Sequence, residues 1–235
     1  MSTRWPVLTV DRPEDFPEIS SASENPNGLL AIGGDLSTAR ICAAYRRGIF
    51  PWFSEGDPIM WWSPDPRMVL RPADFRAQRS LKQSVRRNGW RISIDQAFLA
   101  VIHACASTPR DGQHGTWIVT PMLGAYCRLH REGIAHSVEV WEGETLVGGL
   151  YGLAIGRMFF GESMFSHRSD ASKAALWHLC QTLVDAHWQL IDCQMQTQHL
   201  MSLGAHNIPR VEFVARAQEL SSGPVRDALW QQVAG

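Results

Sequence analysis

Three apolar segments joined by very short turns constrain the fold of this 235-residue chain more than any other feature. They span His136–Trp141, Thr145–Ala154 and Met158–Phe160. Glu142-Gly143-Glu144 forms the first turn, and the second contains Gly156. Parallel strands need a crossover of a dozen residues or more, so connections this short join antiparallel strands. The pattern therefore predicts a three-stranded antiparallel meander.

Helix signals flank the meander on both sides. Before it, Asp95 is a candidate N-cap of one helix, and Thr120-Pro121 begins another that Gly133 ends. After it, we expect a helix from Asp170 to His187 and a strand at Gln189–Gln194. This order predicts an α+β fold with a mixed, largely antiparallel sheet, and it resembles the N-acetyltransferase (GNAT-like) fold. A fold resemblance alone assigns no function.

Residues 1–64 are rich in turn signals, including Asn25-Pro26-Asn27-Gly28 and Gly33-Gly34-Asp35. One short helix is expected there, with Asp35 or Ser37 as its N-cap and Gly48 after its end. Ser63-Pro64-Asp65-Pro66 is typical of an extended junction. We therefore predict a small N-terminal α/β domain at residues 1–64 and a larger domain at residues 65–235.

The composition is that of a folded protein with reduced thiols. Hydrophobic residues make up 45% of the chain, enough for a substantial core. The five cysteines are an odd number without a Cys-x-x-Cys pair, as is typical of the cytoplasm. The N-terminal sequence lacks the apolar core of a signal peptide, and no apolar run approaches the ~18–20 residues of a membrane span. We expect a cytoplasmic protein without membrane association. No metal site is expected either, because there is no His-Glu-x-x-His motif or Cys/His cluster.

A strongly basic segment lies between residues 71 and 91. The whole chain has a formal net charge of −1, yet this segment has seven basic side chains against one acidic, so the other residues sum to −7. A helix is expected over Phe75–Asn88, with Arg79, Lys82 and Arg86 on one face. Two interpretations stay open: a solvated helix face, or a surface that binds a polyanion such as RNA.

Three groups of motifs occur in order along the chain. The N-terminal group contains Gly33-Gly34-Asp35-Leu36, Tyr45-Arg46-Arg47-Gly48-Ile49-Phe50-Pro51-Trp52 and Trp61-Trp62-Ser63-Pro64-Asp65-Pro66-Arg67. The central group is Phe160-Gly161-Glu162-Ser163-Met164-Phe165-Ser166, and the C-terminal group combines Leu190-Ile191-Asp192-Cys193-Gln194 with Ser202-Leu203-Gly204-Ala205. From about Asn25 to Phe213, the chain closely resembles the bacterial leucyl/phenylalanyl-tRNA–protein transferases.

This resemblance implies a reaction. Leu, also Phe and less readily Met, would pass from aminoacyl-tRNA to the α-amine of a protein that begins with Arg or Lys, which marks that protein for N-end rule degradation. An aminoacyl ester is already activated, and positioning the two reactants supplies much of the rate. We therefore expect no cofactor. The expected partners are aminoacyl-tRNA and the acceptor protein, and we expect the enzyme to be a monomer.

Asp192 and Gln194 lie two apart on the expected strand, which places both side chains on one face. The resemblance implies that they are the catalytic pair. Asp192 would orient the Gln194 side-chain amide, whose oxygen accepts a hydrogen bond from the attacking amine. Cys193 would then point to the opposite face and belong to the core. Without the resemblance, the alternative interpretation is that the polar groups of Asp192 and Gln194 only form hydrogen bonds to each other at the end of a strand.

Glu162 is a further implied site residue, between Gly161 and Ser163. A carboxylate there would bind the Arg or Lys cation of the acceptor, or the free amino group of the donor. Glycine lets another chain approach the backbone closely, so we expect Gly161 and Ser163 beside the substrate.

The remaining expected contacts concern the donor. An apolar slot that accepts Leu or Phe and rejects branching at Cβ is expected from Leu150, Phe159, Met164, Phe165 and Leu179. Trp52 and Trp117 are candidates for stacking on the terminal adenosine. The candidates for holding tRNA phosphates are Arg76, Arg79, Lys82, Arg86 and Arg87.

Two other function classes remain as alternatives. A CoA-dependent N-acyltransferase would share the fold, but the chain lacks R/Q-x-x-G-x-G/A, whose backbone amides bind a pyrophosphate. The nearest match, Arg86–Arg91, fails at its last position. A non-catalytic RNA-binding module would explain the basic helix and the aromatic residues, but not the pair Asp192 and Gln194.

Overall fold

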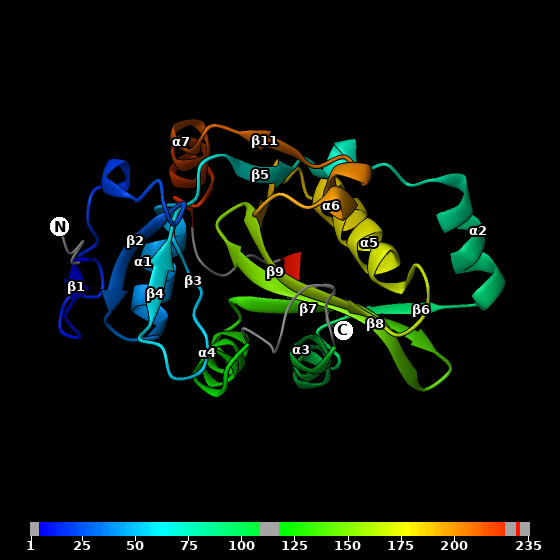
Figure 1. Ribbon diagram of the computed structural model, residues 1–235. Coiled ribbons are helices and arrows are strands. Elements are labelled where there is room, and N and C mark those ends of the chain that lie inside the picture. Colours follow the sequence, from blue (N-terminus) through cyan, green and yellow to red (C-terminus); the bar gives the residue numbers. More distant parts are fainter. Residues whose placement is uncertain (1–4, 109–117, 224–228, 231–235) are drawn as a thin grey trace.

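The computed structural model describes residues 5–108, 118–223 and 229–230, which form two sheets with helices around them (Figure 1). The smaller sheet has the strand order β1 (Val7–Leu8), β2 (Leu29–Gly33), β4 (Met60–Trp62) and β3 (Phe50–Pro51). Helix α1 (Thr38–Arg46) begins where Ser37 Oγ accepts a hydrogen bond from the Arg40 backbone, so the expected cap is confirmed. A short 3₁₀ helix, η1 (Ile19–Ser21), precedes β2.

The larger sheet has seven strands. In spatial order they are β11 (His206–Ile208), β5 (Arg67–Leu70), β10 (Leu190–Gln194), β9 (Met158–Ser166), β8 (Thr145–Ile155), β7 (Ala135–Glu142) and β6 (Arg91–Ile94). Strands β9 and β10 run parallel and the other neighbouring pairs are antiparallel. The meander is therefore confirmed as β7–β8–β9. Its third strand continues to Ser166 instead of ending at Phe160, so Glu162 lies within a strand.

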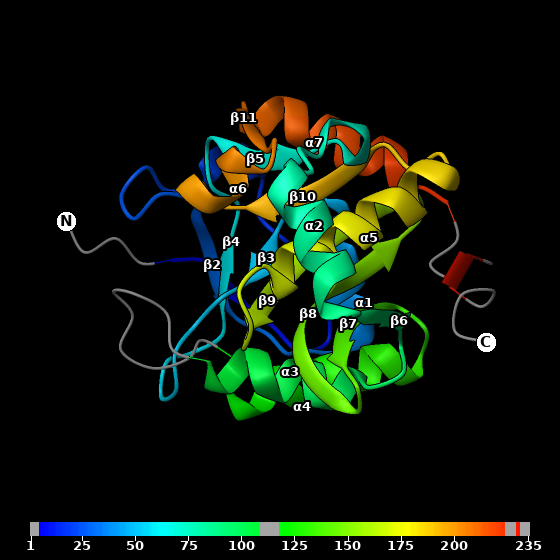
Figure 2. The ribbon, with the colours of Figure 1, turned by 90° about the vertical axis from the view of Figure 1, so that its right-hand side faces the viewer.

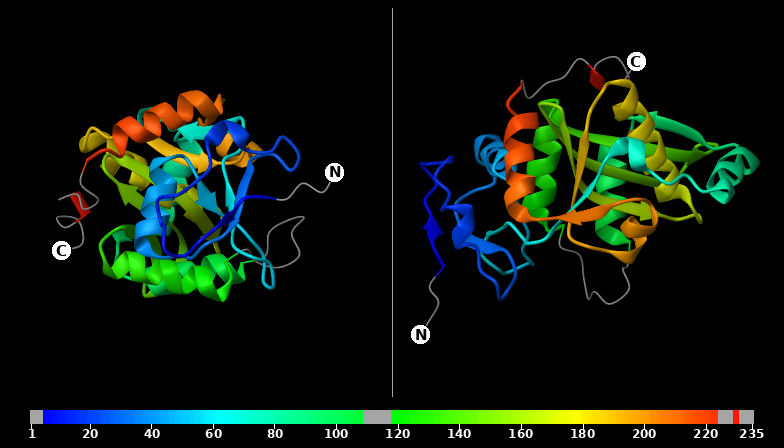
Figure 3. Two further views of the ribbon diagram at one scale, coloured as in Figure 1. Left: turned by 90° about the vertical axis from the view of Figure 1, so that its left-hand side faces the viewer. Right: turned by 90° about the horizontal axis from the view of Figure 1, so that it is seen from above.

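Helices cover both faces of the larger sheet (Figures 1 and 2). Helix α5 (Ala171–Asp185) lies on one face, with α2 (Arg79–Asn88) packed against it. Helices α3 (Phe98–Ser107) and α4 (Thr120–Arg131) lie on the opposite face. Helix α6 (Gln198–Ser202) follows β10, and α7 (Arg210–Leu220) packs beside α1 (Figure 3). No helix in the described part of the chain is long and apolar enough to cross a membrane.

Three expected helix starts differ from the structure. The helix expected over Phe75–Asn88 begins only at Arg79, because Pro72–Asp74 form a separate 3₁₀ helix, η2. The N-cap of α4 is Val119, which leaves Thr120 inside the helix. The N-cap of α3 is Ala97, since the Asp95 carboxylate instead accepts the backbone N–H of Ser137 at 2.8 Å.

The two sheets share a hydrophobic core. Tyr45 and Trp61 from the smaller sheet and its helix belong to the same buried cluster as Phe160 of β9 and Phe213 of α7. A second cluster fills the space beneath α5 and includes Phe159, the neighbour of Phe160 on the opposite face of β9.

Candidate active site

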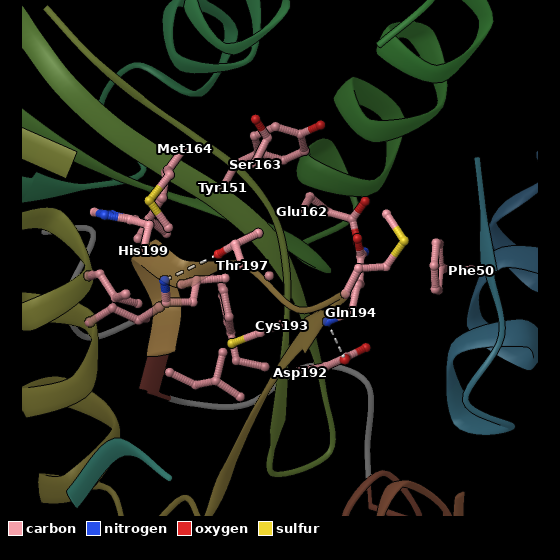
Figure 4. Close-up of a pocket in the computed structure, with 18 of the residues that line it drawn as sticks. Phe50, Tyr151, Glu162, Ser163, Met164, Asp192, Cys193, Gln194, Thr197 and His199 are labelled. Atoms are coloured by element: carbon pink, nitrogen blue, oxygen red, sulfur yellow. Dashed lines mark hydrogen bonds between the residues drawn. The ribbon is translucent and has the colours of Figure 1, made fainter. Parts of the chain in front are cut away.

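A cavity of about 530 Å³ lies between α5, the smaller sheet, the middle of β9 and the end of β10. Phe50, Pro51 and Trp52 line it from the smaller sheet, and Leu176 and Leu179 from α5. Its other walls come from β8, β9, β10 and the segment after β10. Figure 4 shows Glu162 and Gln194 near Phe50, with Met164 and His199 farther from it. Most lining residues are apolar, and the polar residues Glu162 and Gln194 lie on the Phe50 side while His199 lies on the other (Figure 4).

Two β-bulges place the polar groups of this cavity. In β9, Ser163 pairs with Tyr151 and Gly161 with Gly152, which leaves Glu162 as the extra residue. In β10, Asp192 and Gln194 pair with neighbouring residues of β5, which leaves Cys193 as the extra residue. A bulge bends its strand and redirects a side chain. Because β9 and β10 are neighbours, the two bulges bring Glu162 and Gln194 together.

Glu162 is the centre of a buried hydrogen-bond network. Tyr45 Oη donates to Glu162 Oε1 and Tyr126 Oη donates to Oε2, both at 2.7 Å, while Gln194 Nε2 donates to Oε1 at 3.0 Å. Only 8% of Glu162 is exposed. Burial raises the pKa of Glu162 to about 8, although the two tyrosine hydroxyls oppose that shift. The site therefore holds a carboxyl group that can change its charge near neutral pH.

Asp192 forms a different contact from the one expected. Arg67 Nε donates to Asp192 Oδ1 at 2.8 Å, and Nη2 donates to Oδ2 at 2.6 Å. The guanidinium also lies 4.7 Å from the Phe50 ring centroid and 4.4 Å from that of Phe213. Sequence reasoning missed Arg67, because its partner lies 125 positions away.

The Gln194 side chain is held by Glu162, not by Asp192 as expected from the sequence. Asp192 Oδ1 accepts the backbone N–H of Gln194 at 2.9 Å. This bond stabilises the bulge, where Gln194 has a left-handed backbone with φ of 61°. Asp192 and Gln194 both line the cavity, but the expected bond from Asp192 to the Gln194 side-chain amide was wrong, because Asp192 holds the backbone of the bulge instead.

Cys193 lines the cavity, whereas we expected it in the core on the opposite face. The bulge again explains the difference. Burial raises the pKa of the Cys193 thiol, and the nearby Asp192 carboxylate raises it further. The thiol form therefore predominates at neutral pH, which does not suit a nucleophile.

Most of the expected substrate contacts do lie on the cavity wall. Those that line it are Trp52, Leu150, Phe159, Gly161, Glu162, Ser163, Met164 and Leu179. Phe165 does not: it is buried on the other face of β9. Trp117 lies outside the described residues. Lining residues that the sequence did not indicate include Tyr151, Leu176, Ile191, Thr197 and His199.

The expected tRNA contacts are all exposed. Arg79, Lys82, Arg86 and Arg87 project from α2, while Arg76 precedes the helix and its backbone N–H donates to Leu203 O at 2.8 Å. This basic helix packs on α5, whose Leu176 and Leu179 line the cavity.

An apolar cavity that ends in a hydrogen-bonded carboxyl and carboxamide pair suits acyl transfer to an amine. The apolar walls hold an uncharged side chain, and the polar groups can orient an amine. The comparisons with known proteins agree with this class of enzyme. The family model for leucyl/phenylalanyl-tRNA protein transferase matches residues 69–218, and the model for the N-terminal domain of these proteins matches residues 34–65.

Individual relatives are similar over almost their whole length. A leucyl/phenylalanyl-tRNA–protein transferase from Thiobacillus denitrificans is 55% identical, covering 92% of this chain and 94% of the relative. One from Nitrosomonas europaea is also 55% identical, covering 95% and 94%. A solved structure of L-PGS from Bacillus licheniformis has a TM-score of 0.39 and 10% identity over 70% of this chain and 53% of that one, which is too distant to support an argument. The chain belongs to the leucyl/phenylalanyl-tRNA–protein transferase family and is an aminoacyltransferase.

Proposed function

We propose that this enzyme transfers Leu or Phe, and less readily Met, from aminoacyl-tRNA to the α-amine of proteins that begin with Arg or Lys. The observation that supports the proposal is the contact between Gln194 and Glu162 beside an apolar cavity. The cavity offers room for an apolar aminoacyl side chain, and the Glu162 carboxyl group, in its ionised form, offers negative charge to a cationic acceptor.

In the proposed mechanism, Gln194 orients the attacking amine. Its Nε2 donates to Glu162, so its Oε1 is left to accept a hydrogen bond from the acceptor nitrogen. An α-amine has a pKa near ~7.7–8.0 and is partly neutral at physiological pH. It attacks the ester carbonyl, the C–N bond forms and the bond to the ribose oxygen breaks. The proton lost by the nitrogen ends on that ribose oxygen, directly or through water.

Glu162 and Asp192 act through Gln194 in this proposal. Glu162 holds the side-chain amide, and Asp192 holds the backbone of the bulge. We therefore propose both as positioning residues, with the ionised form of Glu162 also attracting the cationic end of the acceptor. Three donors already bond the Glu162 carboxyl group, which favours this role over a direct salt bridge with Arg or Lys.

The donor would contact three regions. Leu150, Phe159, Met164 and Leu179 surround its aminoacyl side chain, Trp52 stacks on the terminal adenosine, and the basic helix α2 contacts phosphates without reading sequence. A GNAT-like fold for the domain at residues 65–235 belongs to the same proposal. Its support is the β7–β9 meander followed by α5 and the parallel strand β10.

The test is transfer of radiolabelled Leu from Leu-tRNA to one acceptor protein made with different first residues. We expect incorporation when the acceptor begins with Arg or Lys and none when it begins with Asp or Gly. Incorporation that does not depend on the first residue would contradict the acceptor assignment. Acetyl-CoA as the donor tests the N-acyltransferase alternative, and we expect no acetylation.

A further inference from the structure

Two side chains on α5 connect the basic helix α2 with the cavity. We call Lys173 and Trp177 the α5 strip. They are four residues apart, so they lie on one face of the helix, one turn from each other. Both are partly exposed, although most of α5 around them is buried. Figure 2 shows α2 lying against α5, so the strip begins where the basic helix packs.

Trp177 forms the end of the strip nearest α2. The Nζ atom of Lys82 lies 5.8 Å from the centroid of the Trp177 ring. A tryptophan that remains partly open to solvent beside a row of basic side chains offers an aromatic face in a positive field. Aromatic faces of this kind stack on unpaired bases without selecting their sequence.

Lys173 forms the other end of the strip. Its Nζ donates to Asp170 Oδ1 at 2.9 Å, so part of its charge is neutralised within the protein. The remaining positive charge of Lys173 still acts on His199, an exposed residue on the cavity wall. Burial lowers the pKa of His199, and the positive charge of Lys173 lowers it further. Lys173 also precedes Leu176, which lines the cavity, by three residues of α5, so the two side chains are neighbours on the helix surface.

We propose that the α5 strip binds the unpaired nucleotides at the 3′ end of aminoacyl-tRNA, with a base stacked on Trp177 and a phosphate near Lys173. This inference rests on the proposed function. If α2 contacts the paired stem and the ester enters the cavity, the single strand between them has to cross α5. The strip supplies an aromatic face and a cation along that path.

The test compares the binding of intact uncharged tRNA with that of the same tRNA lacking its unpaired 3′ nucleotides. For the unaltered enzyme, removal of these nucleotides should weaken binding. Trp177→Ala should weaken binding of intact tRNA by roughly 5- to 150-fold, the range for one stacked base, and leave binding of the shortened tRNA unchanged. Trp177→Phe, which keeps an aromatic face, should recover much of the affinity.

Trp141→Ala is the matched control. Trp141 is also a partly exposed tryptophan beside a basic side chain, with the Arg91 guanidinium 5.0 Å from its ring centroid, but it lies on β7 away from the strip. It should bind both tRNAs like the unaltered enzyme. Equal weakening of both tRNAs by Trp177→Ala, or no weakening of either, would overturn the inference. Because these are binding measurements, they test the binding of the 3′ nucleotides by the α5 strip even if transfer to Arg-starting proteins fails.

Discussion

Arg67 and Asp192 form an ion pair with two hydrogen bonds, although at most 1% of either side chain is exposed. Removing one partner from a buried ion pair leaves an uncompensated charge in the interior. From the sequence alone, we would expect Asp192→Ala to impair transfer while leaving the fold almost intact. The structure changes that expectation, because Asp192 is also a stabilising residue.

We predict that Asp192→Ala and Arg67→Ala each lower the free energy of unfolding by about 3–5 kcal/mol. Replacing both residues together, as Arg67→Met with Asp192→Leu, should restore part of that loss because no charge is left unpaired. Urea denaturation measures all three variants. The control is Arg168→Ala, which breaks a 3.2 Å pair with Glu142 on the surface and should cost less than about 1 kcal/mol. An Asp192→Ala variant as stable as the unaltered protein would contradict this interpretation.

Gln194 allows its proposed catalytic role to be tested separately from its effect on stability. Its backbone is left-handed, which costs a residue with a Cβ atom about 1–2 kcal/mol and costs glycine little. We predict that Gln194→Ala and Gln194→Gly both lower kcat by roughly 100-fold or more, since both lack the carboxamide. The glycine variant should nevertheless be about 1 kcal/mol more stable than the alanine variant. Thermal unfolding and steady-state transfer rates give the two readouts. If either variant kept near-normal turnover at saturating substrates, Gln194 would not be catalytic.

Glu162 should make stability depend on pH. Its pKa is raised from 4.5 to about 8, so the folded state retains this proton more strongly than the unfolded state. Its contribution to stability is fully present below about pH 4.5 and is lost as pH rises through about 8. We predict that the unfolding free energy of the unaltered protein, relative to Glu162→Gln, falls by up to about 4 kcal/mol between pH 5 and pH 9. Denaturant titrations at several pH values measure this difference, and a flat difference would show that burial does not raise the pKa.

The cavity should select donors by the shape of the side chain. Leu and Ile are isomers, so a difference between them has to come from a steric clash at Cβ rather than from hydrophobic transfer energy. We predict that Leu-tRNA outcompetes Ile-tRNA by about 10- to 200-fold for one Arg-starting acceptor. Met164→Ala should enlarge the cavity and favour Phe over Leu.

A neighbouring residue supplies the control for this prediction. Phe165→Leu alters the next side chain of β9, which is buried on the opposite face. It should change stability and leave the ratio of Leu to Phe incorporation as it is. A ratio that shifts equally in both variants would indicate a general disturbance of β9.

Local sequence signals predicted the elements that depend on neighbouring residues. The turns at Gly143 and Gly156 predict the meander, and Ser37 predicts the start of α1. The bulges were not predictable in this way, because the extra residues Glu162 and Cys193 are defined by pairing with other strands. A strict two-residue alternation therefore gave the wrong face for Cys193 and the wrong partner for the Gln194 amide.

The site contacts that the sequence did not predict join residues that are far apart in the chain. Tyr45 lies 117 positions from Glu162, and Tyr126 lies 36 positions from it. Neither tyrosine stands out in the sequence, since a tyrosine on the apolar face of a helix is ordinary core. Their hydroxyls become significant only when the fold brings them against a buried carboxyl group that needs hydrogen-bond donors.

Tyr45 lies on α1 but donates a hydrogen bond to Glu162 in the larger sheet, and this contact has a consequence for protein engineering. Grafting only the larger sheet and its helices into another scaffold would remove one of the three donors that hold Glu162, together with the Phe50 ring that lies against Arg67. A transplanted site would therefore have to include α1 and β3. The smaller sheet cannot be treated as an interchangeable module, because the contacts that hold Glu162 and Arg67 cross the boundary between the two sheets.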